Sequence, residues 1–260
     1  MLCYHGVGAV AGGDDSHGLF IGRNLFDEHV ETIAARGYRL TTVGELHRGM
    51  AGGGVQAKGA ISFDDALAKT GVEAVAVLLE RGVKCSVFVP TGLIGRRHPD
   101  VPSEPIMTAE EIREFADAGV EFGAHSVDHL RLSGMSYEAA LDQMRRSRAE
   151  LEDVVGKPVN TMAYPYGSHD VQTMRAAAEA GFECACACSG PAPWSAFSVP
   201  REPVYPSVSP LRLRLKIAGL YGPAHALVAE GRPLSRWREM RGREPSEHAH
   251  MKPEGRRSTI

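Results

Sequence analysis

The sequence predicts an α/β fold built on a mostly parallel sheet, either open or closed into a barrel. Three observations predict it: short apolar segments alternate with amphipathic ones, glycines end several amphipathic segments, and about seven such strand–helix steps follow one another. The 260 residues match the roughly 250 of a single α/β barrel. Because such folds place their chemistry at the carboxyl ends of strands, we look for functional residues there.

The predicted strands are short and bounded by turns. Residues 84–90 are the clearest, because apolar side chains recur there at every second position. A strand over residues 2–7 opens the chain, and a short buried strand over residues 60–63 precedes a pair of aspartates. The remaining predicted strands cover residues 38–43, 120–124, 161–164 and 182–188.

The predicted helices begin and end at residues that favour helix termini. Thr108 opens a helix and has Glu111 three residues later, the pattern of a capping box. Ser136 opens the longest helix, which Gly156 ends. The Ala-Gly-Gly-Gly run at residues 51–54 predicts a flexible loop. The predicted helices cover residues 26–35, 71–80, 108–118, 136–155 and 171–180.

Charge and composition exclude several classes of protein. Lys and Arg number 29 and Asp and Glu 32, and the resulting net charge of −3 argues against a dedicated nucleic-acid binder. No segment reaches the roughly 18 uninterrupted apolar residues of a membrane span. The amino terminus lacks the basic and apolar regions of a signal peptide, so we expect a cytoplasmic protein.

We expect one domain over residues 1–231 and a disordered polar tail over residues 232–260, where eight Lys and Arg accompany four Glu. The five cysteines are an odd number, and Cys184, Cys186 and Cys188 alternate along one predicted strand. Such a set is a poor disulfide framework. It favours a strand of small residues packed in a reduced core over a soft-metal site.

The first cluster of chemical interest is Ser62-Phe63-Asp64-Asp65, which ends a predicted strand. Two adjacent carboxylates beside an apolar strand are unfavourable unless a positive charge lies near them. Aspartate is also favoured at a helix N-cap, so this cluster alone is compatible with a purely structural role as well as a functional one.

The second cluster is the pair His125 and His129, which follows the predicted strand 120–124. Histidines four residues apart would present both imidazoles on one side of a helical turn, an arrangement that a zinc ion accepts. The spacing alone is common by chance. Its place at a strand end favours a functional role.

The third cluster is Tyr164-Pro165-Tyr166, which follows another predicted strand. Two tyrosines around a proline form either a rigid rim with polar tips or a structural turn. When the three clusters are taken together at strand ends, one aspartate and two histidines would form a metal site with open positions. The second aspartate would then be left as a base.

These motifs resemble those of the polysaccharide deacetylases of the NodB-homology type, carbohydrate esterase family 4. The family's Thr-Phe-Asp-Asp-Gly motif corresponds to residues 62–66, and its His-Ser/Thr-x-x-His motif corresponds to residues 125–129. Its Arg-x-Pro-Tyr motif corresponds to residues 163–166, here as an Ala-Tyr-Pro-Tyr-Gly subgroup variant. The resemblance covers roughly residues 1–220 and implies a distorted (β/α)7-type barrel.

The resemblance also implies roles for the site residues. Asp65, His125 and His129 would bind a divalent metal. Two histidines and one carboxylate favour Zn2+, while Co2+, Ni2+ or Fe2+ stay open. Asp64 would be the general base for a metal-activated water.

Two supporting roles are also expected, the first of them from the same resemblance. Tyr164, Pro165 and Tyr166 would line the substrate site, with a backbone N–H at Tyr166 stabilising the oxyanion. Independently of the resemblance, Ser126 is expected to fix the histidine segment through a side-chain hydrogen bond, as a serine in a first turn can.

Two departures from the family pattern concern the base and the acid. The family's arginine that holds the catalytic aspartate is replaced here by Ala163. Arg201 could supply that charge from another strand end, or could be a surface residue between prolines. The family's Leu-x-His motif, which provides the general acid, is missing near the carboxyl terminus. His5, His169 and His225 are candidates to replace it, and we favour His5.

We therefore predict a metal-dependent hydrolase that removes an N-acetyl group from an N-acetylated amino sugar, such as N-acetylglucosamine, or from a glycoconjugate. The same site could instead hydrolyse an O-acetyl ester or a formyl group. A protein that had lost its acid and its arginine could also be an inactive sugar-binding module. The expected partner is the sugar, with no nucleic acid and no membrane span, and no oligomeric state is predicted.

Overall fold

The computed structural model describes residues 1–10, 14–52, 59–188 and 195–218. Contacts divide the chain into two units, Met1–Arg214 and Leu215–Ile260. The first unit contains all the described strands and every described helix up to the start of the last one. The predicted domain boundary at residue 231 and the predicted polar tail lie outside the described residues.

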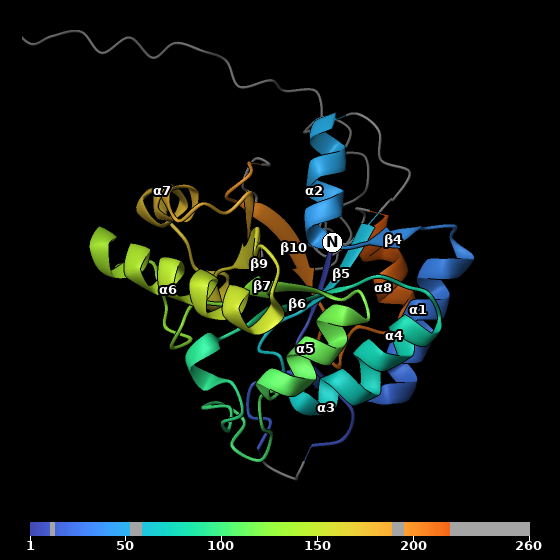
Figure 1. Ribbon diagram of the computed structural model, residues 1–260. Helices are drawn as coiled ribbons and strands as arrows, with labels where there is room; N and C mark the ends of the chain where they lie inside the picture. Colours follow the sequence, from blue (N-terminus) through green and yellow to red (C-terminus); the bar gives the residue numbers. More distant parts are fainter. Residues whose placement is uncertain (11–13, 53–58, 189–194, 219–260) are drawn as a thin grey trace, which may run out of the picture. The chain divides into compact units, whose positions relative to one another are not determined.

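A parallel β-barrel lies at the centre of the first unit (Figure 1). Eight strands form one sheet in the order β1-β10-β9-β8-β7-β6-β5-β4, and β1 also pairs with β5. This pairing closes seven strands into a ring and leaves β4 outside it, so the predicted barrel is confirmed. The strands of this sheet are β1 (Leu2–Tyr4), β4 (Leu40–Thr41), β5 (Gly59–Phe63), β6 (Ser86–Val89), β7 (Glu121–Ala124), β8 (Thr161–Ala163), β9 (Cys184–Cys188) and β10 (Val199–Pro203). A separate two-stranded sheet pairs β2 (Gly6–Val7) with β3 (Phe20–Ile21).

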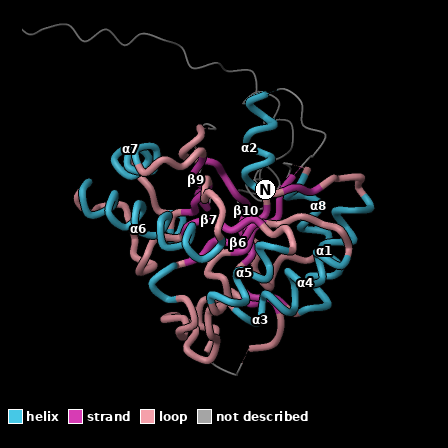
Figure 2. Tube along the Cα trace, viewed as in Figure 1, coloured by secondary structure: helices cyan, strands magenta, loops and turns pink. Residues whose placement is uncertain are grey.

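Helices lie around the strands (Figure 2), and two of them begin at the predicted caps Thr108 and Ser136. Thr108 Oγ1 accepts a hydrogen bond from Glu111 N at 3.2 Å, and the Glu111 carboxylate accepts one from Thr108 N at 2.8 Å. Ser136 Oγ caps the longest helix, which Gly156 ends with φ 64°. The helices are α1 (Arg23–Ala35), α2 (Val43–Gly52), α3 (Ala68–Thr70), α4 (Ala76–Glu80), α5 (Ala109–Asp117), α6 (Tyr137–Val155), α7 (Val171–Glu179) and α8 (Pro210–Ile217). No helix in the described part of the chain is both long and apolar enough to cross a bilayer.

The predicted first strand, residues 2–7, is in fact two strands in different sheets. β1 stays in the barrel, whereas β2 leaves it to pair with β3. Gly6 permits the departure because a Cβ there would lie 2.4 Å from the Phe20 ring. His5 is therefore left between the two strands, just past the carboxyl end of β1.

The segment at residues 43–52 forms helix α2, where the sequence predicts a strand end and the start of a flexible loop. Glu121, on β7, holds its amino terminus: both carboxylate oxygens lie 3.1 Å from Gly44 N, which donates to them. A carboxylate at a helix amino terminus satisfies free N–H groups and the helix dipole. Because this partner lies 77 residues away, the local sequence does not reveal it.

Two further boundaries differ from the prediction. The predicted helix over residues 71–80 begins earlier, at α3, and contains a π-helical turn over Gly71–Val75. β10 is not among the predicted strands, because Pro200 and Pro203 interrupt its pattern, and the sequence places a strand end at Arg201 only as one of two alternatives. Cys184 and Cys186 are buried in the barrel core as expected, and Cys188 is half-buried.

Candidate active site and metal centre

The loops that follow β1, β5, β7 and β8 meet at the carboxyl end of the barrel. A cavity of about 500 Å³ opens there, within the range typical of small-molecule sites. Its lining includes His5, Asp64, Asp65, His125, His129 and Tyr166. Most of the predicted site residues therefore share one cavity.

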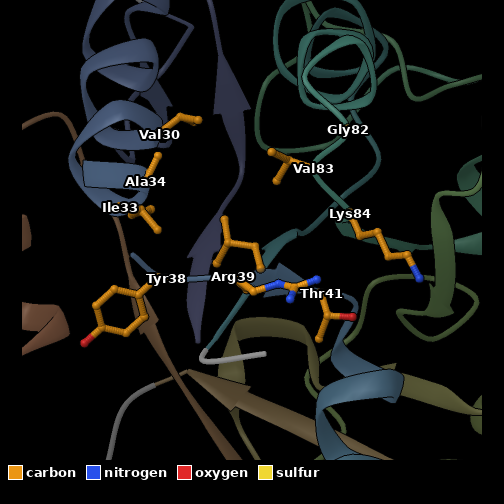
Figure 3. Close-up of a pocket in the computed structure, with 10 residues that line it drawn as sticks. Val30, Ile33, Ala34, Tyr38, Arg39, Thr41, Gly82, Val83 and Lys84 are labelled. Carbon is orange, nitrogen blue, oxygen red and sulfur yellow. The ribbon is translucent and has the colours of Figure 1, made fainter. Parts of the chain in front are cut away.

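A second cavity of about 400 Å³ lies between α1 and the segment before β6 (Figure 3). Apolar side chains such as Val30, Ile33 and Val83 share its walls with polar groups, including the cations Arg39 and Lys84. The residues that line it include no acidic, histidine or cysteine side chain. It offers neither a base nor a metal ligand, so the chemistry belongs to the cavity at the strand ends.

Three of the predicted residues converge as a possible metal centre. Asp65 Oδ1 lies 3.5 Å from His125 Nε2 and 3.1 Å from His129 Nε2, and all three side chains are buried. A tetrahedral ion with N and O ligands at 2.0–2.2 Å would separate these donors by about 3.4 Å. Asp65 Oδ1 has no hydrogen-bond partner among the described residues. These residues therefore fit a divalent metal.

A second contact orients the first histidine of this group. His125 Nδ1 lies 2.8 Å from the Ala163 carbonyl, which can only accept, so Nδ1 carries the proton and Nε2 presents its lone pair. Burial lowers the pKa of His125 to about 4, so the ring is neutral near pH 7. A neutral imidazole with a free Nε2 is the form that binds a metal.

The histidine segment is a loop, and the predicted helical turn is wrong. Ser126 and His129 both have left-handed φ angles, 61° and 55°, which an α-helix excludes. Gln143, on α6, holds the loop: its Oε1 accepts hydrogen bonds from Val127 N at 3.0 Å and Asp128 N at 3.2 Å. The sequence pattern showed two histidines but not the residue that positions them.

The predicted role of Ser126 is also wrong. Its buried hydroxyl has no hydrogen-bond partner among the described residues. The loop is instead tied through its backbone, because Thr91 N donates to the Ser126 carbonyl at 3.1 Å.

Arg201 makes a two-point contact with Asp64. Its two terminal nitrogens lie 2.6 Å from Asp64 Oδ1 and 2.8 Å from Asp64 Oδ2, and only 2% of Arg201 is exposed. Burial alone would raise the pKa of Asp64, but the guanidinium outweighs it and holds that pKa below its usual range. Arg201 is therefore a buried partner of Asp64 and not a surface residue between prolines.

The third cluster divides into buried and exposed parts, and its prediction as a continuous rim is wrong. Tyr164 is fully buried, and its hydroxyl donates to the Phe197 carbonyl at 3.0 Å. Pro165 is buried as well, and neither residue lines the cavity. Only Tyr166, which is 53% exposed, faces the cavity with its side chain.

The three candidate general acids differ in where they lie relative to the cavity. His5 is half-buried and lines the cavity beside Asp64. His169 lies outside that lining, with Nε2 2.8 Å from Ser198 Oγ and its ring stacked on Tyr164. His225 lies outside the described residues. His5 is therefore the candidate acid that the described cavity contains.

His98 is a site residue that the sequence analysis missed. It is 1% exposed, its Nε2 lies 3.5 Å from Asp65 Oδ2, and its ring packs edge-on against His129. Asp100 N donates to His98 Nδ1 at 3.1 Å, so in the neutral ring the proton is on Nε2, the nitrogen nearer Asp65, which makes no hydrogen bond among the described residues. The sequence feature that could have pointed to His98 is its place in the proline-rich loop that follows the strand predicted at residues 84–90.

Backbone strain is concentrated in the site. Five described residues other than glycine have left-handed φ angles, and all belong to the motifs around the cavity: Asp65, Ala66, Ser126, His129 and Tyr166. Each such residue costs on the order of 1 kcal/mol, and strain of this kind tends to gather at functional sites. Ala66, with φ 50°, stands where the family motif has glycine.

Comparison with known families now adds to this geometry. A family model described as polysaccharide deacetylase matches residues 55–185, just over half of the chain. The chain belongs to the polysaccharide deacetylase family. Within the matched region lie Asp64 and all three residues of the possible metal centre, Asp65, His125 and His129, while Arg201 and His5 lie outside it.

One curated protein and two solved structures are similar to this family member. The Bacillus subtilis (strain 168) protein YxkH, which carries the name of a polysaccharide deacetylase, is 23% identical over 185 residues. That alignment covers 70% of this chain and 62% of YxkH, so the chain spans less than two thirds of that relative.

Two solved structures share the fold. The Streptococcus pyogenes deacetylase PplD, in complex with acetate, matches with a TM-score of 0.72 and 22% identity over 83% of this chain and 96% of its own. A de-N-acetylase from Aggregatibacter actinomycetemcomitans matches with a TM-score of 0.70 and 16% identity over 82% and 97%. At these identities the likeness is one of fold.

Proposed function

We propose that this chain is a metal-dependent hydrolase that removes an N-acetyl group from an N-acetylated amino sugar or glycoconjugate. One observation carries the proposal: Asp64, paired with the buried Arg201, faces the same cavity as the Asp65–His125–His129 group. Family membership supports a deacetylase, and the name of the Aggregatibacter protein supports an amide substrate.

Asp65, His125 and His129 would hold the metal. A divalent metal bound by this group would supply a Lewis acid for the acyl carbonyl and would lower the pKa of a bound water towards about 7. The N2O donor set favours Zn2+, and Co2+, Ni2+ or Fe2+ have compatible ligand preferences. His98 would orient Asp65 through Oδ2 and leave Oδ1 facing the two histidines.

Asp64 would act as the general base. Its Oδ2 lies 4.0 Å from His125 Nε2, so the carboxylate borders the metal-binding group without belonging to it. Arg201 keeps Asp64 ionised and holds it in one orientation through two hydrogen bonds. Asp64 would take a proton from the attacking water as that water adds to the carbonyl carbon.

His5 would supply the proton that the departing amine needs. Amide hydrolysis requires an acid because an unprotonated amine is a poor leaving group. His5 reaches the cavity from the end of β1, and a ligand atom of its ring lies within 4.8 Å of an Asp64 carboxylate oxygen. An acid and a base from different strands would thus meet at one substrate.

Tyr166 would contact the sugar. Its ring is exposed at the cavity and lies beside His129, with a centroid separation of 4.9 Å. The Arg131 guanidinium lies over the same ring, 5.0 Å from its centroid. An exposed ring of this kind offers an apolar face to a pyranose, and the backbone N–H of Tyr166 would be the oxyanion donor.

The experiment is acetate release from matched N-acetylated and O-acetylated sugars, from N-acetylglucosamine to oligomers and glycoconjugates. Metal-stripped protein would be assayed with and without added Zn2+, beside Asp64→Asn. We expect release from an N-acetyl compound that needs the metal and is lost in the variant. Release from O-acetyl esters alone would favour an esterase. Metal binding without release from any compound would favour an inactive sugar-binding module.

A further inference from the structure

An arginine lines the active-site cavity without forming an ion pair. Arg131 lies in the loop after β7, is exposed, and makes no ion pair or hydrogen bond with any of the described residues. Its guanidinium instead lies over the Tyr166 ring, 5.0 Å from the centroid. Asp100 accepts from the Tyr166 hydroxyl at 3.5 Å but is not in ion-pair contact with Arg131. The N–H donors of the guanidinium are therefore available to a ligand in the cavity.

Tyr166 holds this guanidinium close to the possible metal centre. The centroid of the same ring lies 4.9 Å from that of the His129 ring. The two separations together place the guanidinium carbon of Arg131 within about 10 Å of the His129 ring. A substituent on the reacting sugar, or on the sugar next to it, can span this distance. Stacking on the ring also limits the rotamers of the long side chain, which lowers the entropy cost of holding it against a ligand.

The carboxylates that line the cavity have counter-charges of their own. Asp64 is paired with the buried Arg201. Asp65 belongs to the possible metal centre, and Asp100 borders that centre, with a carboxylate oxygen within 4.8 Å of one of its histidine nitrogens. A divalent ion at the centre would balance these two carboxylates. Among the described carboxylates and arginines of the site, Arg131 is therefore the charge that is left for a substrate.

We propose that Arg131 selects an N-acetylated sugar that carries an oxyanion, either a carboxylate or a phosphate. This inference rests on the proposed function and names the substrate class of the same site. A guanidinium presents paired N–H donors in a plane, which match two oxygens of a carboxylate or a phosphate.

The exposure of Arg131 sets the size of the effect. A hydrogen bond to a charged group contributes more than a neutral one, but solvent and salt screen a charge that lies at the mouth of a cavity. Arg131 should therefore provide a preference of about tenfold for the charged sugar, and the preference should shrink as the salt concentration rises.

Binding is tested by calorimetry on the full chain loaded with Zn2+, with three amino sugars that have no acetyl group to release: glucosamine, glucosamine 6-phosphate and muramic acid. All three carry the amine, and the last two add a phosphate and a carboxylate, so the comparison isolates the oxyanion. We expect at least one charged sugar to bind about tenfold more tightly than glucosamine. A preference for the phosphate alone or for the carboxylate alone would support the proposal and identify the source of the oxyanion.

Arg131→Gln should bring the ratio of the charged-sugar affinity to the glucosamine affinity close to one. The matched control is Arg175→Gln, because Arg175 is also exposed and lies over a tyrosine ring, that of Tyr137 at 5.1 Å, but does not line the cavity. It should keep the full ratio, and circular dichroism confirms that each variant is folded. The proposal is overturned if the three sugars bind alike or not at all. It is also overturned if the preference survives in Arg131→Gln, because the oxyanion then binds elsewhere, such as on the metal.

Acetate release from the N-acetylated forms of the same sugars is measured separately. We expect a charged sugar to have the higher kcat/KM and Arg131→Gln to remove most of that preference. Binding that depends on the oxyanion, without acetate release from any sugar, would retain the Arg131 site and overturn the deacetylase. Acetate release that does not distinguish charged from neutral sugars would retain the deacetylase and overturn the selection by Arg131.

Discussion

Arg201 and Asp64 form a two-point ion pair across 137 residues of sequence, at the carboxyl end of a closed barrel. The pair is buried, and Arg201 also donates to Ser62 Oγ at 3.1 Å and lies over the Phe88 ring. A buried carboxylate without a cation would protonate, because burial raises the pKa of the acid. The pair therefore keeps the proposed base charged in a site that would otherwise neutralise it.

Replacing Arg201 by Met should destabilise the protein and alter its pH profile. Removing one partner of a buried ion pair costs about 3–5 kcal/mol of unfolding free energy, because the remaining charge stays buried. The pKa of Asp64 should rise in this variant, so activity should fail at a higher pH as the solution is acidified. Denaturant unfolding and the acid limb of the pH–rate profile measure the two effects.

A second variant, Arg201→Lys, tests the geometry of the contact separately from its charge. It keeps the positive charge but loses the planar two-point contact. It should fall between the unaltered protein and Arg201→Met in both measurements. Arg146→Met, at an exposed arginine of α6, is the control and should cost no more than about 0.5 kcal/mol. Equal losses at Arg146 and Arg201 would contradict the assignment.

His98 should govern metal affinity through Asp65. Its Nδ1 accepts from Asp100 N, and its Nε2 faces Asp65 Oδ2. Asn places an amide group near the Nδ1 position and Gln places one near the Nε2 position, so the two substitutions separate the two contacts. We expect His98→Asn to weaken metal binding by about 10–100-fold and His98→Gln by less.

Competition with a chromophoric chelator measures these affinities directly, without an activity assay. Thermal unfolding of the metal-stripped variants serves as the control for folding. If both variants bind metal as tightly as the unaltered protein, His98 has no part in holding Asp65.

The sequence predicted the residues whose signal is local. Asp64 and Asp65 end a recognisable strand, and His125 and His129 lie four residues apart after another. The strand-end rule was then enough to bring them together, because parallel strands end at the same face of a barrel.

The sequence could not predict contacts that depend on the path of the chain between strands. Gln143 and His98 reach the site from α6 and from a loop, and neither carries a motif. The expected helical turn is also absent, because Ser126 and His129 have left-handed φ angles. The spacing of two histidines along the sequence does not predict the backbone angles between them. Tyr164 was predicted to lie at the rim of the site, but it is buried and its hydroxyl donates to the Phe197 carbonyl.

Gln143 should matter for both stability and metal binding. Its Oε1 accepts two backbone N–H groups of the histidine loop, and its Nε2 donates to Asp128 Oδ2 at 2.7 Å. Leucine at this position would leave those groups without their acceptor, at a cost of about 2–3 kcal/mol. A looser loop should also weaken metal binding, because it carries two of the three ligands.

Denaturant unfolding and chelator competition on Gln143→Leu check both effects. The control is Gln172→Leu, the same substitution at an exposed position of α7, expected within about 0.5 kcal/mol of the unaltered protein. A stable Gln143→Leu protein with unchanged metal affinity would show that the backbone contacts alone hold the loop.

His29 should make stability depend on pH. It is buried, its Nε2 donates to the Val208 carbonyl at 2.7 Å, and its Nδ1 accepts from the Tyr4 hydroxyl at 3.2 Å. Burial lowers the pKa of His29 below its ordinary value, so the folded protein holds the ring neutral. The unfolded chain takes up this proton first, at about pH 6.5, and the contribution to stability is lost as pH falls from there through the lower folded pKa.

The measurement is the unfolding free energy at a series of pH values for the unaltered protein and for His29→Gln. Glutamine places an amide near the Nε2 position and can still donate to the Val208 carbonyl, but it does not titrate. The difference in unfolding free energy between the two proteins should therefore stay constant above about pH 6.5. Below that pH the unaltered protein should lose stability relative to the variant. His17→Gln, at an exposed histidine, should leave the slope unchanged. Parallel curves for the unaltered protein and His29→Gln would mean that His29 takes up its proton equally in the folded and unfolded states.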